Sequence, residues 1–279
     1  MASNLSPLAV IDSRAKIGDN VTVGPYCVIG PDVEIASDTH LTNSVTVLGH
    51  TRIGSHNVLF PNVVIGADPQ DISYKGEPTR VVIGEHNHFR EGVTVNRATT
   101  KENGLTQVGN YNYFMANSHI AHDCVVGDNV ILANGALLGG HTHVHNRAII
   151  SGNVGVHHWV TVGAYSFIGG MSRIVHDVPP FMLVEGHPST VRCVNLVGLK
   201  RQGFTANEIA SLAEAYRLVY RAKMGLDHAR EILETHNHFN AHVRHLVDFI
   251  QCQRMGSHGR QRDGGRKTQP AASPGRSAA

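Results

Sequence analysis

The side chains best suited to chemistry surround His122. Eighteen residues separate His122 from Gly140 and Gly140 from His158, and the same step leads from Asp123 to His141. A neutral imidazole beside a carboxylate can act as general base on a hydroxyl that attacks an acyl carbon, while backbone N–H groups hold the resulting oxyanion. If an eighteen-residue step stacks residues one above another, this group predicts acyl transfer with His122 as the base.

A six-residue repeat is the feature of the chain that would create such stacking. Aliphatic residues or Phe recur at every sixth position in three runs: Leu5, Ile11, Ile17, Val23, Ile29, Ile35, Leu41, Val47, Ile53, Leu59 and Ile65; Ile83, Phe89 and Val95; Val108, Phe114, Ile120, Val126, Leu132, Leu138, Val144, Ile150, Val156, Val162, Ile168 and Ile174. This period is neither the 3.6 of a helix nor the 2 of a simple strand, and it fits one side of a triangular coil. Glycine often follows the aliphatic residue, where we expect turns that need a permissive backbone.

Three such sides make one coil of eighteen residues, with neighbouring coils ~4.8 Å apart as in any β-sheet. The composition agrees, because 29 glycines, 6% aromatic residues and one tryptophan leave only small aliphatic side chains for a core. The sequence therefore predicts an all-β left-handed parallel β-helix, with a C-terminal α-helical domain.

Breaks in the repeat set the expected domain boundaries. The β-helix is expected over 1–180, with two polar external loops at 67–81 and 96–107, and it ends where consecutive prolines cannot donate to the strand ladder. An α-helical domain is expected over 181–255, followed by a disordered tail over 256–279 that is rich in Gly, Arg and Ser.

Within the helical domain, three helices are predicted. The first begins at Thr205, which forms a capping box with Glu208, and the others run over 226–233 and 241–250.

Composition also excludes several classes of protein. A formal charge of +2 is too balanced for bulk binding of nucleic acid. The four cysteines are widely separated and form no CxxC pair, so neither a zinc ribbon nor a disulfide framework is indicated. No secretory signal is visible at the start, and no stretch reaches the ~18 apolar residues that span a bilayer. We therefore expect a cytoplasmic protein without stable membrane insertion.

Two other functions remain open from the residues alone. Three histidines, His119, His122 and His141, could bind zinc and leave an open position, as in a metal-dependent, carbonic-anhydrase-like enzyme on the same scaffold. A non-catalytic scaffold is the other alternative, although the polar loops would then have no purpose. No GxSxG nucleophile elbow is present, so we favour the hypothesis of acyl transfer by a histidine base, with no cofactor and no metal.

Three motifs resemble those of a known family. They are IGADPQDISYKGEPTRVVIG (65–84), NSHIAHDCVVGDNVILAN (117–134) and GLKRQGF (198–204). Together they resemble the UDP-N-acetylglucosamine O-acyltransferases of lipid A biosynthesis, and the resemblance extends in order from about residue 5 to residue 250. The repeat alone also occurs in acetyltransferases and carbonic anhydrases, so another sugar acyltransferase on the same scaffold is a further alternative, whereas HIAHDC combined with QDxxYxGEPTR is specific to this family.

The resemblance implies an enzyme that moves a 3-hydroxyacyl chain from acyl carrier protein to the glucosamine 3-hydroxyl of UDP-N-acetylglucosamine, without metal or cofactor, as a homotrimer with sites between subunits. It implies that His122 is the base, that Asp123 orients it, and that Gly140 supplies the oxyanion N–H. Substrate contacts are implied at the following residues: Gln70, Asp71, His119, His141, Gly152, His157, His158, Gly170, Asn195 and Arg201.

The chain also departs from the family pattern. The lysine usual after QDL is Ser73 here, with Lys75 close enough to substitute, and an acidic residue and a second arginine are replaced by Val197 and Gln202. Gly170 resembles the glycine that leaves room for a longer acyl chain. A surface for acidic acyl carrier protein is expected from six basic residues: Arg173, Lys200, Arg201, Arg217, Arg221 and Lys223.

Overall fold

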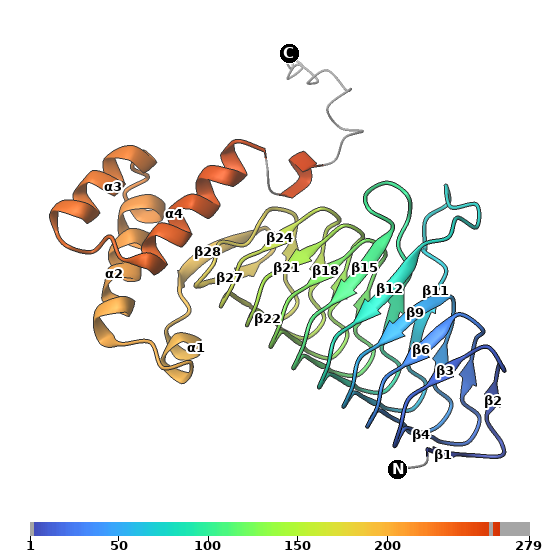
Figure 1. Ribbon diagram of the computed structural model, residues 1–279. Helices are drawn as coiled ribbons and strands as arrows, with labels where there is room; N and C mark the ends of the chain where they lie inside the picture. Colours follow the sequence, from blue (N-terminus) through green and yellow to red (C-terminus); the bar gives the residue numbers. More distant parts are fainter. Residues whose placement is uncertain (1–2, 257–258, 263–279) are drawn as a thin grey trace.

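Short parallel strands coil into a three-sided prism, and helices follow at its C-terminal end (Figure 1). The computed structural model describes residues 3–256 and 259–262. Sheet A contains β1 (Asn4–Leu5), β4 (Thr22–Val23), β7 (His40–Leu41), β10 (Val58–Leu59), β13 (His88–Phe89), β16 (Tyr113–Phe114), β19 (Ile131–Leu132), β22 (Ile149–Ile150), β25 (Phe167–Ile168), β27 (Met182–Gly186) and β28 (Ser189–Val194).

Sheets B and C form the other two sides. Sheet B contains β2 (Val10–Ile11), β5 (Val28–Ile29), β8 (Thr46–Val47), β11 (Val64–Ala67), β14 (Thr94–Asn96), β17 (His119–Ile120), β20 (Leu137–Leu138), β23 (Gly155–Val156) and β26 (Arg173–Ile174). Sheet C contains β3 (Lys16–Ile17), β6 (Val33–Ile35), β9 (His50–Ile53), β12 (Arg80–Ile83), β15 (Leu105–Val108), β18 (Val125–Val126), β21 (His143–Val144) and β24 (Thr161–Val162). The chain visits A, B and C in turn, so each of the three corners is identified below by the sheets it joins.

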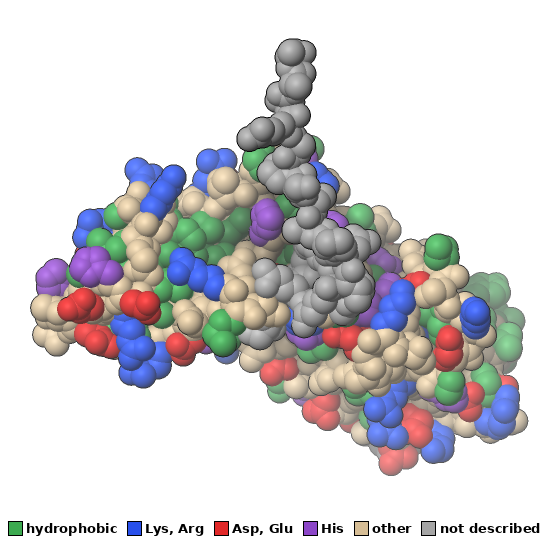
Figure 2. Space-filling view, turned by 90° about the horizontal axis from the view of Figure 1, so that it is seen from above, with side chains coloured by type: hydrophobic (Ala, Val, Ile, Leu, Met, Phe, Trp, Pro, Cys, Tyr) green, Lys and Arg blue, Asp and Glu red, His purple; other side chains and the backbone are tan. Residues whose placement is uncertain are grey.

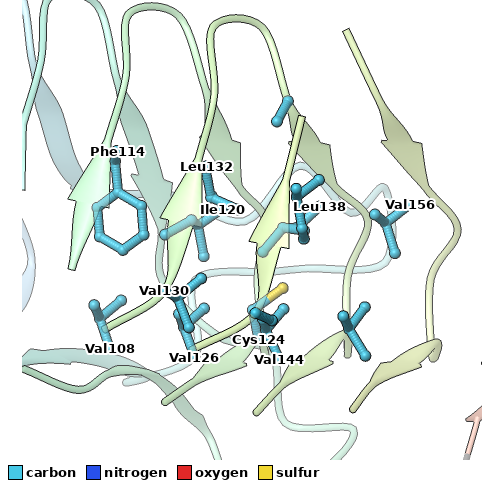
Figure 3. Close-up of a cluster of buried hydrophobic side chains, with 14 of the residues drawn as sticks. Val108, Phe114, Ile120, Cys124, Val126, Val130, Leu132, Leu138, Val144 and Val156 are labelled. Carbon is cyan, nitrogen blue, oxygen red and sulfur yellow. The ribbon is translucent and has the colours of Figure 1, made fainter. Parts of the chain in front are cut away.

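The eighteen-residue register is confirmed wherever no loop intervenes. Phe114 pairs with Leu132, and Leu132 pairs with Ile150, each one coil further along sheet A. These repeat positions point inward, and Figure 3 shows residues of several coils meeting in the prism interior. Only the first coil is incompletely covered, because no coil lies beyond it, and Leu5 remains 43% exposed.

The glycines that follow the repeat residues do not have the role expected of them. The left-handed backbone conformation at the corners falls mostly on other residues, such as Asn129, Arg147 and Tyr165 with φ of 55°, 61° and 58°. Gly24 instead has no room for a side chain, since a Cβ there would lie 1.3 Å from the carbonyl oxygen of Thr42 in the next coil. Most of these glycines therefore permit close contact between coils.

Two insertions leave the prism near its middle, and they project from the same edge in Figure 1. They occupy 68–79, between β11 and β12, and 97–104, between β14 and β15, slightly inside the predicted bounds. Two ion pairs join the insertions to each other: Lys101 contacts Asp71, and Arg97 contacts Asp68.

The helices are α1 (Leu196–Arg201), α2 (Ala206–Tyr216) with a π-helical extension (Arg217–Arg221), α3 (Leu226–Thr235) and α4 (Ala241–Arg254), followed by a 3-10 turn (Gly259–Arg262). The capping box of Thr205 and Glu208 is confirmed at the start of α2, and the other two predicted helices correspond to α3 and α4. No helix in 3–256 or 259–262 is long and apolar enough to cross a membrane.

The expected boundary between β-helix and helical domain at residue 180 is too early. Residues 182–194 form β27, which extends sheet A in parallel with β25, and β28, which pairs antiparallel to β27. The buried residues Met182, Val184 and Val194 fall off the six-residue grid, which is why the repeat did not predict these strands. Of the predicted tail over 256–279, only residues 256 and 259–262 lie within the described part of the chain.

Candidate active site

His122 lies at the corner between sheets B and C, where β17 turns into β18. Its Nδ1 lies 2.8 Å from Oδ2 of Asp123, and its side chain is 12% exposed. An imidazole that donates from Nδ1 to a carboxylate keeps its lone pair on Nε2. The geometry therefore leaves Nε2 as the nitrogen that can accept a proton from a substrate.

Gly140 lies against this imidazole from the next coil. A Cβ at Gly140 would lie 2.4 Å from Cε1 and 2.7 Å from Nε2 of His122, so only glycine fits here without displacing the ring. The Gly140 carbonyl accepts from the Trp159 N–H, but the Gly140 N–H has no acceptor among residues 3–256 and 259–262. A free N–H beside a candidate base is the donor that an oxyanion requires.

Asp123 is fixed by residues that the sequence pattern did not single out. Both the N–H and the hydroxyl of Thr99 donate to its Oδ2, at 2.9 and 2.8 Å, and its own N–H donates to Thr106 Oγ1. Asp123 is 1% exposed. Because Thr99 belongs to the 97–104 insertion, outside the repeat, no periodic signal could have placed it beneath the carboxylate.

His141 is the second imidazole at this corner. Its Nε2 lies 3.8 Å from Asp123 Oδ2, and its Nδ1 lies 2.9 Å from Glu102 Oε2. Trp159 stacks flat on the ring at 3.9 Å between centroids. Trp159 follows His141 by eighteen residues, so the repeat could have revealed it, whereas Glu102 lies in the insertion and carried no such signal.

The 3-10 turn at 259–262 reaches the same corner. Arg262 donates to the carbonyl oxygens of His141 and Trp159, at 2.6 and 3.0 Å, and its Nη1 lies 3.6 Å from Glu102. A residue from the predicted tail therefore contacts the wall of the site.

His119 lies on strand β17, three residues before His122, on the outer face of sheet B. Its Nδ1 is 2.7 Å from the hydroxyl of Thr94 in the preceding coil. Burial, with a smaller contribution from the charge of His122, lowers the pKa of His119 below its usual value. The ring is thus held in its neutral form more readily than a solvated histidine would be.

Asp71 is a carboxylate of the first insertion. Lys101, together with the hydroxyl and N–H of Ser73, holds its pKa well below the usual range. The cation beside Asp71 is Lys101, which comes from the second insertion. Lys101 pairs with Asp71, and the next residue, Glu102, contacts His141. The second insertion therefore links Asp71 to the corner that holds His141.

The remaining candidates are dispersed over the prism. His157 and His158 lie at the same corner as the base, with their rings 3.7 Å apart, and His158 is exposed. Gly152 and Gly170 stack on each other at the corner between sheets A and B. Gln70 is exposed in the first insertion.

Asn195 and Arg201 lie at the third corner, between sheets C and A. Asn195 caps α1 by accepting from the Gly198 N–H, and it donates to the carbonyl oxygen of Tyr165. Both residues line a pocket of about 530 Å³, together with Arg147, Ile149, Tyr165, Phe167, Leu183, Cys193, Val194, Leu196, Val197, Gly198 and Gln202. Within one chain, this pocket and His122 occupy different corners.

The corner at His122 also holds a group capable of binding a metal. Ligand atoms of His122, Asp123 and His141 lie within 4.8 Å of one another. His119, which the sequence offered as a third ligand, is not in this group. Asp123 Oδ2 already accepts hydrogen bonds from Thr99, and His141 Nδ1 faces Glu102, so a cation would compete with existing contacts.

Comparisons with known proteins agree with this architecture. Residues 177–258 match the family model described as UDP N-acetylglucosamine O-acyltransferase, domain 2, and residues 105–140 match the bacterial transferase hexapeptide model. A third model, the GMPPB C-terminal domain, matches residues 5–103.

Similar proteins of known name share most of their length with this chain. An acyl-[acyl-carrier-protein]–UDP-N-acetylglucosamine O-acyltransferase from Syntrophobacter fumaroxidans is 45% identical over 90% of this chain and 98% of its own. The solved UDP-N-acetylglucosamine acyltransferase of Francisella novicida is 40% identical, with a TM-score of 0.85, over 90% of this chain and 92% of its own. The corresponding structure from Bacteroides fragilis gives 38% and 0.84 over 88% and 96%. The chain therefore belongs to the family of acyl-[acyl-carrier-protein]–UDP-N-acetylglucosamine O-acyltransferases.

Proposed function

We propose that this enzyme transfers a 3-hydroxyacyl chain from acyl carrier protein to the glucosamine 3-hydroxyl of UDP-N-acetylglucosamine, with His122 as general base. The observation that carries the proposal is the arrangement of His122, Asp123 and Gly140. The imidazole has a carboxylate on Nδ1, and in the described part of the chain neither its Nε2 nor the Gly140 N–H beside it forms a hydrogen bond. Family membership supports the substrates.

The proposed reaction is a single transfer through a tetrahedral intermediate. Nε2 of His122 takes the proton of the sugar hydroxyl as its oxygen attacks the thioester carbonyl, and the Gly140 N–H donates to the oxyanion. Collapse then breaks the C–S bond, the C–O ester bond remains, and the proton on Nε2 passes to the departing thiolate. Asp123 keeps the imidazole in the required tautomer throughout.

A homotrimer would complete the site. Asn195 and Arg201 are proposed to bind the nucleotide, yet their pocket lies at the C–A corner while the base lies at the B–C corner. A substrate that reaches both from one prism would have to pass around a full side of it. Packing the C–A corner of one subunit near the B–C corner of the next removes this difficulty, and light scattering tests the assembly directly.

Acyl carrier protein is proposed to dock at the helical end. Of the six basic residues expected there, Arg217 is paired with Glu214, while Arg173, Lys200, Arg201, Arg221 and Lys223 are exposed and form no ion pair with the described residues. Figure 2 shows Lys and Arg on this end together with acidic side chains, so the attraction depends on local groups rather than on one uniform patch. Raising the salt concentration should therefore weaken the interaction. We further propose that the protein acts in the cytoplasm.

The test is replacement of His122 by alanine. Loss of a general base is expected to lower kcat by about 10²–10⁴-fold with no change in fold or assembly. Activity is followed by incubating the protein with UDP-N-acetylglucosamine and acyl carrier proteins of several chain lengths, and weighing the products. Turnover near the wild-type level in this variant would refute the proposed base.

A metal-dependent reaction is the second candidate, and the cluster of His122, Asp123 and His141 is the observation that favours it. Elemental analysis of the purified protein separates the two. Stoichiometric zinc, with activity lost to chelators and restored by zinc, would replace the proposed mechanism. Full activity of metal-stripped protein would support the proposed metal-free mechanism.

A further inference from the structure

We infer that Arg147 supplies a second cation for the diphosphate of the nucleotide substrate, opposite Arg201, and so sets the affinity for that substrate. The inference rests on the proposed function, and it assigns a role to a residue that no sequence motif singled out. It starts from the pocket at the C–A corner, where Arg147 comes from the prism and Arg201 from α1.

The eighteen-residue step explains how Arg147 reaches this pocket. Asn129, Arg147 and Tyr165 follow one another at the same corner of three successive coils, each with a left-handed backbone. The guanidinium of Arg147 lies over the Tyr165 ring, 5.9 Å from its centroid. Tyr165 is itself packed against Phe181 and Phe204, with centroids at 5.8 and 5.1 Å, so Arg147 rests on a fixed aromatic surface.

No carboxylate of the described residues neutralises the two arginines. Neither Arg147 nor Arg201 forms an ion pair with a carboxylate in 3–256 or 259–262, whereas many other arginines do, such as Arg217 with Glu214. Arg147 is half-buried, and its Nη1 donates to the side-chain oxygen of Gln202, a neutral group. Two guanidiniums of like charge, held at one pocket without counter-charge, are suited to a dianion.

The rest of the lining indicates what carries that dianion. Ile149, Phe167, Leu183 and Val194 give the pocket apolar walls. The buried amide of Asn195 donates to the Tyr165 carbonyl and accepts from the Gly198 N–H, which fixes its orientation and leaves one N–H and one lone pair for a ligand. A flat uracil ring stacked on these walls, with the diphosphate at the arginine side, matches this division between apolar and charged groups.

Gln202 then has a positioning role. Its side-chain oxygen accepts from Arg147, which directs the guanidinium toward α1, where Arg201 is the preceding residue. An arginine at position 202 would place a positive charge at the same spot from the other element. The pair Arg147–Gln202 is therefore equivalent in charge to an arginine at position 202 with a neutral residue at position 147.

The test compares Arg147→Ala with the double variant Arg147→Ala/Gln202→Arg. We expect Arg147→Ala to raise the KM for UDP-N-acetylglucosamine and the Kd for UDP by about 10- to 100-fold, the range of one charge-assisted hydrogen bond, with kcat changed by less than about threefold. Uridine, which has no phosphate, should bind both proteins equally. The double variant should recover most of the UDP affinity. Arg52→Ala, which removes an exposed arginine of β9 far along the chain, is the matched control for charge.

Each outcome decides between alternatives. Equal UDP affinity in wild type and Arg147→Ala would refute the inference, as would an equal loss of uridine and UDP, because the residue would then shape the pocket rather than bind phosphate. Failure of the double variant to recover, with its fold intact by circular dichroism, would refute the proposed equivalence with position 202. UDP binding is also measured in His122→Ala, a variant expected to turn over poorly, so that affinity for the nucleotide is assessed separately from catalysis. A wild-type protein that binds no UDP at all would overturn both the inference and the proposed function.

Discussion

Replacing Gly140 with alanine should abolish most activity while leaving the β-helix folded. Gly140 does not adopt a left-handed backbone, so alanine brings no backbone strain. The three atoms nearest to the added methyl would all belong to the imidazole of His122. The added methyl group would therefore push the His122 ring away from its position between two successive coils.

The size of the effect follows from the distances. The new Cβ would lie 2.4 Å from His122 Cε1, and ordinary van der Waals contact begins at 3.4 Å, so the ring must move by about 1 Å. Such a movement lengthens or breaks the 2.8 Å bond to Asp123 and shifts Nε2 from the substrate hydroxyl. A misplacement of about 1 Å can cost about 10²-fold in rate, which corresponds to about 2.7 kcal/mol in the barrier.

The assay measures kcat for acyl transfer by mass spectrometry, beside a thermal melt and light scattering. Gly30→Ala is the matched control, because a Cβ there makes only ordinary contacts, the nearest at 3.5 Å to Leu48 Cα, near the opposite end of the prism. It should retain wild-type kcat. If Gly140→Ala also turned over at the wild-type rate, the proposed packing of glycine against the base would be wrong. If Gly140→Ala lost activity only because it unfolded, the result would contradict the expectation that the β-helix stays folded.

Three further predictions concern charged side chains, two of them at the candidate site. Asp123→Asn should lower kcat by about 10³-fold with the fold kept, since the amide no longer holds the imidazole in the Nδ1–H tautomer; a loss below tenfold in the kinetic assay would contradict this. Lys101→Met removes the main cause of the lowered pKa of Asp71, so the acidic limb of the kcat/KM profile should move to higher pH, and an unmoved limb would show that the Asp71 carboxylate is not needed. Burial raises the pKa of Asp177 from 3.8 to about 6, so this carboxyl binds its proton more tightly in the folded state and costs stability as pH rises from about 4 through 6. Asp177→Asn should thus gain about 1–2 kcal/mol in urea unfolding at pH 8 and almost nothing at pH 4, and a variant less stable at both values would refute the assignment.

The part of the site that the sequence could predict is the part that lies on the repeat. Because one coil takes eighteen residues, arithmetic on residue numbers was enough to place Gly140 against His122 and His141 beside Asp123. The same arithmetic would have found Trp159, had it been applied to every polar group at that corner. The helices α2, α3 and α4 were predictable for a similar reason, since caps and apolar spacing are local properties.

Contacts made by the insertions could not be obtained in this way. Thr99 and Glu102 reach Asp123 and His141 from a segment with no period, and the path of such a loop depends on what it packs against. The role of the glycines that follow the repeat residues was mispredicted for the same reason. The clash that a side chain at Gly24 would make with the next coil exists only once the coils are stacked.

The sequence by itself determined the architecture and the stacking of Gly140 on His122, because both follow from a period that each hexapeptide repeats locally; the family motifs are likewise local features of the sequence. Only the tertiary structure decided which cation pairs with Asp71, that Arg262 returns to the corner of His141 and Trp159, and that Arg147 and Arg201 line one pocket. Those pairings join segments separated by dozens of residues and lie off the grid, so they are set by the packing of whole elements rather than by any local pattern.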